Sequence, residues 1–229
     1  MMPRRILTLT TVLLALAAGI AGVPAKAQNQ PAIPGATVLP DGNLQVGDIT
    51  VRRTVGELAF PAKIVLEAGP LEVIIAHPHG RLHETLLVTE VKALQVQTML
   101  YLLGAENGQR LPGPGQKQGT LVDIDLEWTD SKGEKQRQPI ENWIQDRRTE
   151  KTMRRIGWTF VGSIIQEGQF LADVEGNVVV NYSVGSTVLD VPDPESLEDD
   201  TLHSVHTEPV RAAGGAGKAV TVVFKPRRQ

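Results

Sequence analysis

Apolar and polar residues alternate most clearly in residues 120–128, where acidic and apolar side chains follow one another with a period of two. Val122, Ile124 and Leu126 then share one strand face with Trp128, and this period predicts a half-buried β-strand. Turn residues follow at 131–134, so residues 135–140 are expected to return as the hairpin partner. Short β-rich runs between turn signals predict further strands at residues 71–76, 85–89, 158–161, 170–172, 178–182 and 219–224.

Two segments instead show helical spacing. In residues 92–103, four apolar side chains recur three and four positions apart on one face: Val96, Met99, Leu100 and Leu103. Residues 140–148 predict a shorter helix, with Pro139 near its start and Arg147 and Arg148 suited to its C-terminal end. The fold class we expect is α+β and β-dominated, with antiparallel sheet(s), one main amphipathic helix and one shorter helix.

The N-terminus carries a targeting pattern. Arg4 and Arg5 precede an apolar stretch that ends in Ala25-Lys-Ala27, which predicts a secretory signal peptide over residues 1–27. The alternative, a retained membrane anchor, is disfavoured by the threonines in the stretch and the small residues at its end. Residues 28–43 are rich in Gln, Pro, Ala and Gly and predict a flexible lead-in. Residues 44–229 then form a single domain, and the protein is expected in the periplasm or outside the cell.

Composition removes several classes of function. The chain has no cysteine, which excludes a lipoprotein anchor, an iron–sulfur cluster and thiol chemistry. The formal net charge is −3 and becomes more negative when the basic leader is removed, which argues against nucleic acid as a partner. No later segment is long and apolar enough to predict a membrane span. An envelope protein or a small ligand is the partner class that remains.

Three of the chain's five histidines cluster, at His77, His79 and His83. Imidazole nitrogens are ligands for zinc and copper. His77 and His79 would share a face on a strand, whereas Pro78 and Gly80 favour a turn that could bring His83 toward them. The segment is therefore a candidate divalent-metal site with these three ligands, in a metal-binding protein or a metal-dependent hydrolase. The alternative is an exposed turn whose histidines bind nothing.

Asp123, Asp125 and Glu127 share the other face of the alternating strand. Two carboxylates at such spacing could serve a glycosidase, and their oxygens could bind calcium. We favour the alternative that this face is simply solvated. Since no serine-hydrolase, P-loop or dinucleotide-binding motif is complete, no catalytic residue is assigned.

Several short motifs occur in an order that resembles a known family. Residues 80–89 match a Gly-Gly-Lys-x-His-Glu-Ser-Leu-Leu-Val segment, and residues 96–105 match a leucine-rich helix that ends in Gly-Ala. Further matches lie at 143–144, 158–163 and 172–176. Together, over residues 45–226, they resemble the YdjY-domain family, a group of exported bacterial proteins of uncharacterised function. The resemblance implies no catalytic residues.

The family's His-Glu dipeptide falls on His83 and Glu84, whereas His77 and His79 lie outside its pattern. His83 and Glu84 are therefore candidate binding residues, able to hold a ligand or shuttle a proton. The alternative is that His83 is structural and Glu84 exposed, since neighbours on a strand face opposite ways unless the chain turns. We expect a non-enzymatic binding or interaction module of the cell envelope.

Overall fold

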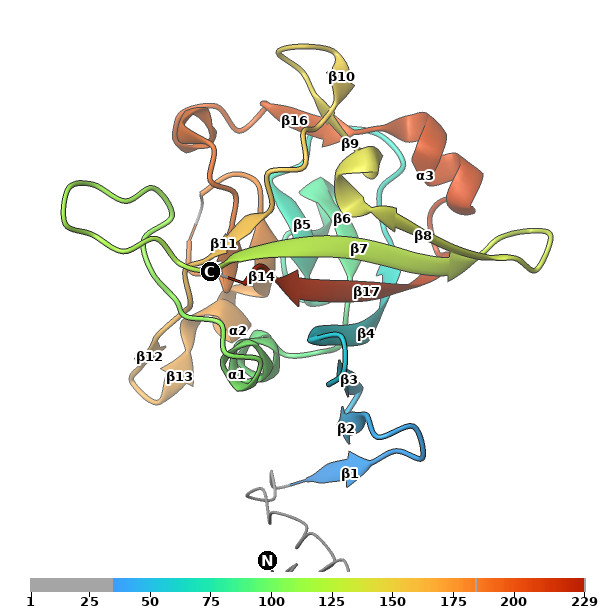
Figure 1. The fold of residues 1–229 in the computed structure, drawn as a ribbon. Coiled ribbons are helices and arrows are strands. Elements are labelled where there is room, and N and C mark those ends of the chain that lie inside the picture. The colour runs from blue at the N-terminus through green and yellow to red at the C-terminus, as the bar shows by residue number, and fades with distance from the viewer. Residues whose placement is uncertain (1–34, 184, 229) are drawn as a thin grey trace, which may run out of the picture. The chain divides into compact units, whose positions relative to one another are not determined.

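The alternating segment forms β7 (Leu121–Thr129), the longest strand of the described residues. Val122, Ile124 and Leu126 are fully buried, and the acidic residues between them are half-buried. β8 (Lys135–Pro139) pairs antiparallel with β7 across the predicted turn. The computed structural model, which describes residues 35–183 and 185–228, therefore confirms the period-two interpretation (Figure 1).

Most other predicted strands are present. They are β5 (Val73–Ala76), β6 (Thr85–Val88), β11 (Trp158–Phe160), β14 (Asn177–Val180) and β17 (Ala219–Pro226). The structure adds β1 (Ala36–Val38), β2 (Leu44–Val46), β3 (Ile49–Arg52), β4 (Glu57–Ile64), β9 (Ile144–Asp146), β10 (Lys151–Thr152), β12 (Ile165–Gln166), β13 (Gln169–Phe170), β15 (Leu189–Asp190) and β16 (His203–Val205). β1 lies inside residues 28–43, the predicted flexible lead-in, and pairs with β2.

Eight strands of the described residues close into a barrel-like sheet. Their order is β4-β17-β7-β11-β15-β14-β5-β6, and β6 pairs back with β4. In Figure 1 β17 runs beside β7, with β4 on its other side. β3 continues the sheet from β4, and β8 lies beyond β7. β9 pairs with β10 and β16 in a separate three-stranded sheet.

The prediction of antiparallel sheets is wrong for two pairs. β5 pairs parallel with β6, and β14 pairs parallel with β15. The segment after β5 does not make a tight hairpin. It turns at residues 77–80 and passes through the 3₁₀ turn η1 (Leu82–Glu84), so that Thr85 lies opposite Val73 at the start of β5. The β-dominated α+β class is confirmed, and the sheet is mixed.

The predicted main helix is α1 (Ala93–Leu102), whose residues Val96, Met99 and Leu100 are buried. Two further helices occur in the described residues, α2 (Leu171–Glu175) and α3 (Thr207–Ala213). α2 begins where the pattern predicted a strand over 170–172, and only Gln169–Phe170 is extended there. In Figure 1 α2 lies beside α1, which it contacts.

The shorter helix predicted over 140–148 is wrong. The 3₁₀ turn η2 (Ile140–Trp143) leads directly into β9, which pairs with β10 and β16. Trp143 and Ile144 are fully buried, and this burial with the strand pairing outweighs the local helical signals. Arg148 binds the carboxylate of Asp146 at 2.7 Å instead of a helix C-terminus.

The closed sheet encloses the aromatic core. Phe60 and Phe224 meet edge to face with ring centroids 5.2 Å apart. Trp158 is fully buried, and its Nε1–H donates to Asn181 Oδ1 at 3.0 Å. All described residues belong to one compact unit, and none of their helices is long and apolar enough to cross a membrane. The predicted signal peptide, residues 1–27, lies outside them.

Candidate functional site

The turn after β5 brings His77 and His79 together. The backbone N–H of His77 donates to the carbonyl oxygen of Gly176 at 2.8 Å, which ties the turn to the end of α2. Nε2 of His79 lies 2.7 Å from the carbonyl oxygen of Asp173. Because a carbonyl only accepts, this nitrogen carries the hydrogen, and Nδ1 of neutral His79 has a free lone pair. Nδ1 of His77 lies 2.7 Å from that lone pair and donates to it.

Two glycines permit this close approach. A Cβ on Gly176 would lie 2.8 Å from the Cα of Gly80, and Gly176 has a φ of +75°. Any side chain at this position would therefore push the histidine turn away from α2. Nε2 of His77, on the other side of its ring, faces the Glu90 carboxylate at 3.9 Å.

His83 and Glu84 lie in η1, where the chain turns instead of continuing as a strand. Their side chains can therefore meet, and His83 Nε2 lies 3.6 Å from Glu84 Oε2. The His83 side chain is 75% exposed. Burial raises the pKa of Glu72, the neighbouring Glu84 carboxyl raises it further, and Arg81, at 3.1 Å, opposes the shift. Glu84 of the family-like dipeptide thus lies next to the buried Glu72 carboxyl group, and the role of the dipeptide stays a prediction.

The three histidines do not form one cluster. In the described parts of the chain, no three His, Asp or Glu side chains are placed to hold a metal ion together. His77 and His79 face each other, whereas the contact of His83 is with Glu84. A metal role for His77, His79 and His83 stays a prediction, and the geometry separates the pair from the third residue.

The acidic face of β7 is covered by arginine side chains. Arg52 binds Glu127 through two hydrogen bonds of 2.8 and 2.7 Å, and these hold the pKa of Glu127 below its ordinary value. The remaining pairs are Asp123 with Arg227 and Arg155, Asp125 with Arg137 and Arg155, and Glu127 with Arg137. These carboxylates form a half-buried ion-pair network, which differs from the free solvated face expected from the sequence.

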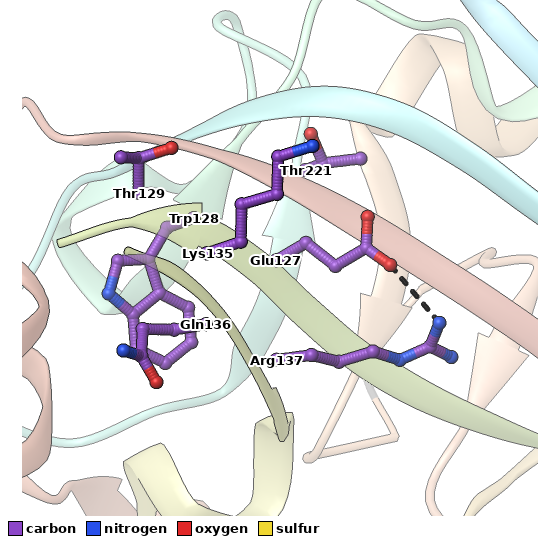
Figure 2. A pocket seen from close by; sticks show the side chains of 7 residues that line it. All are labelled: Glu127, Trp128, Thr129, Lys135, Gln136, Arg137 and Thr221. Atoms are coloured by element: carbon purple, nitrogen blue, oxygen red, sulfur yellow. Dashed lines mark hydrogen bonds and ion pairs between the residues drawn. The ribbon is translucent and has the colours of Figure 1, made fainter. Parts of the chain in front are cut away.

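A groove of about 430 Å³ lies at the end of the β7–β8 hairpin. Figure 2 shows its lining residues, Glu127, Trp128, Thr129, Lys135, Gln136, Arg137 and Thr221. The indole of Trp128 packs edge-on against Trp143, with ring centroids 5.3 Å apart. Arg137 donates to Glu127 at 3.1 Å, whereas Lys135 takes part in no ion pair within the described ranges.

Two buried ionisable side chains lack hydrogen-bond partners among the described residues. Glu141 is 1% exposed, and burial raises its pKa to about 7, although Arg155 opposes the shift. His203 is also 1% exposed, and burial lowers its pKa. Both groups therefore favour their neutral forms in the folded protein.

Sequence reasoning located the histidine turn and the carboxylate face but missed the groove and Glu141. No local pattern marked the groove, which forms where residues of β7, β8 and β17 meet. Nothing local marked Glu141 as buried. The chain matches no protein-family model, no curated protein and no solved structure.

Proposed function

We propose that this protein is an exported, non-enzymatic binding module of the YdjY type. Its ligand is a small molecule with a carboxylate or similar anionic group, and it binds in the groove at the β7–β8 end. The observation that carries this proposal is the Lys135 ammonium, which takes part in no ion pair of the described residues, in a groove that Trp128 also lines.

The charge pattern around the groove supports an anionic ligand. The four neighbouring arginines, Arg52, Arg137, Arg155 and Arg227, each bind carboxylates of the protein itself. Lys135 is exposed and its ammonium is available. Lys135 pairs with Thr129 and lies on the hairpin face of Glu127 and Arg137, whereas the Trp128 indole packs against Trp143 on the other face. The Lys135 ammonium is therefore the group that would hold the negative part of a ligand.

The carboxylates of β7 support a role in binding rather than catalysis. A glycosidase needs one carboxyl group that donates a proton and a second with a different role. Asp123, Asp125 and Glu127 are each held by arginines at 2.7 to 2.8 Å. For Glu127 these contacts hold the pKa below its ordinary value, so this carboxyl group is unsuited to donate the proton.

A ligand screen tests the proposal. Small carboxylic acids and their uncharged primary amides are added separately to the protein, and thermal unfolding and tryptophan fluorescence are followed. We expect at least one acid to raise the unfolding temperature while its amide does not, because only the acid can pair with Lys135. Lys135→Gln should weaken binding of that acid about 10-fold, the order expected for a charge-assisted contact of about 1.5 kcal/mol.

Lys132→Gln is the matched control, because Lys132 is an exposed lysine on the same hairpin turn and does not line the groove. It should leave binding unchanged. Equal responses to acids and amides, or equal losses in the two lysine variants, would contradict a ligand site at this groove.

A further inference from the structure

The histidine turn has the arrangement of a metal site. His77 and His79 present the same ring atom, Nδ1, to one point, with the two nitrogens 2.7 Å apart. Metal–imidazole bonds are about 2.0–2.1 Å long, which places two nitrogens on one ion roughly 2.9–3.4 Å apart. The two rings therefore need to separate by only a few tenths of an ångström to share a cation.

The opposite nitrogen of the His79 ring is also placed as in metal sites. A ligating histidine usually donates its second N–H to a backbone carbonyl or a carboxylate, which fixes the tautomer and the ring orientation. Nε2 of His79 donates to the Asp173 carbonyl at 2.7 Å, as in such sites. Nε2 of His77 lies 3.9 Å from the Glu90 carboxylate, which is beyond hydrogen-bond distance, so only His79 has this outer partner.

The geometry points to a binding site for one divalent transition-metal cation on Nδ1 of His77 and Nδ1 of His79, without His83. Two imidazoles favour copper and zinc over magnesium and calcium, and copper binds such nitrogen sites most tightly among the divalent first-row metals. Two protein ligands leave the remaining coordination positions to water or to a further ligand. This site lies on other elements than the groove and does not depend on the proposed function.

Contacts with α2 fix the position of the two histidine rings. The carbonyl of Asp173 lies 94 positions from His79 in the chain, and the contact of Gly80 with Gly176 fixes the distance between the two segments. His77 is half-buried and His79 is exposed, so a cation can reach the pair from solvent without opening the fold.

Copper titration of untagged protein tests the site. We expect one Cu²⁺ per chain by calorimetry and an electron paramagnetic resonance spectrum with coupling to two imidazole nitrogens. His79→Ala should weaken binding at least about 10-fold, because it removes one of the two ligands of the metal. His83→Ala is the matched control and should leave affinity and spectrum unchanged.

Two results would overturn the site. One is sub-stoichiometric copper in the unmodified protein; the other is an equal loss of affinity in His83→Ala and His79→Ala. Circular dichroism checks that the variants fold. If His79→Ala does not fold, ¹⁵N spectra of the unmodified protein with Zn²⁺ decide: shifts confined to Nδ1 of His77 and His79 support the site, and shifts elsewhere or none reject it.

Discussion

Glu141→Gln should remove a pH-dependent loss of stability. Glu141 is 1% exposed, and its two carboxylate oxygens have no hydrogen-bond partner among the described residues. Burial raises its pKa from 4.5 to about 7; the backbone N–H of Glu141 itself and then Arg155 oppose the shift, and Asp123 adds to it. The folded state therefore holds a proton over a pH range in which the unfolded chain releases it.

The sign and size follow from proton linkage. Below pH 4.5 both states are protonated, and Glu141 adds no pH dependence. Between pH 4.5 and about 7 the unfolded state ionises first, so the free energy of unfolding falls as the pH rises. At about 1.36 kcal/mol per pKa unit, a rise of about 2.5 units makes the loss about 3.4 kcal/mol once the pH is well above 7. Glutamine resembles the protonated acid in shape and does not titrate, so the variant should be more stable by about that amount at pH 8 and nearly equal at pH 4.

Urea unfolding at pH values from 4 to 8 measures this difference. Linear extrapolation gives the free energy of unfolding at each pH, and agreement between tryptophan fluorescence and circular dichroism checks two-state behaviour. Other titrating groups, such as Asp190, whose pKa burial raises to about 6, are common to both proteins. They cancel in the difference between variant and parent.

The test is how the difference in free energy of unfolding between variant and parent changes with pH. Glu134→Gln, at an exposed position of the β7–β8 turn, is the control and should give a difference near zero throughout. A flat curve for Glu141→Gln between pH 4.5 and 8 would refute the argument, since it would mean that the carboxyl group is solvated or paired in the folded state.

Three further substitutions test backbone packing, an ion pair and core packing in turn. Gly176→Ala should lower the free energy of unfolding by about 1–3 kcal/mol in urea unfolding, because φ is +75° and the new Cβ would lie 2.8 Å from the Cα of Gly80; no loss would show that the turn can move. Arg52→Ala removes two hydrogen bonds to Glu127, so ¹³C-detected titration should show the pKa of Glu127 rising toward its ordinary value; an unchanged titration would show that Arg52 is not the cause. Leu100→Ala, at a fully buried position of α1, should cost about 2–5 kcal/mol by thermal or urea unfolding, and a loss well below 1 kcal/mol would contradict its packing.

Elements with a strong local pattern were predictable. β7 and α1 occur where the periods of two and of three to four placed them, because one continuous apolar face decides each element. Residues 140–148 failed as a helix since β9 gains hydrogen bonds from the adjacent β10 and from β16, which lies far along the sequence. The parallel pairing of β5 with β6 could not be predicted either, because it depends on the path of the connecting segment.

The candidate sites divide in the same way. The sequence alone located the histidine segment and the alternating acidic residues, because both are local patterns. The family resemblance already set His83 apart from the other two histidines, but the facing of His77 and His79 depends on a carbonyl of α2 that lies 94 positions from His79. The sequence could not show that arginines from other segments cover the acidic face of β7.

A β-rich, cysteine-free domain with one clear amphipathic helix can be read from the chain alone, because hydrophobic periodicity and composition act through neighbours along the chain. Three features depend on the folded chain instead: the closure of the sheet from β6 to β4, the burial of Glu141 and the facing of His77 and His79. Each of these three features depends on contacts between segments that are distant in the sequence. The free energy of such contacts is gained only when the whole chain folds, and no local pattern encodes it.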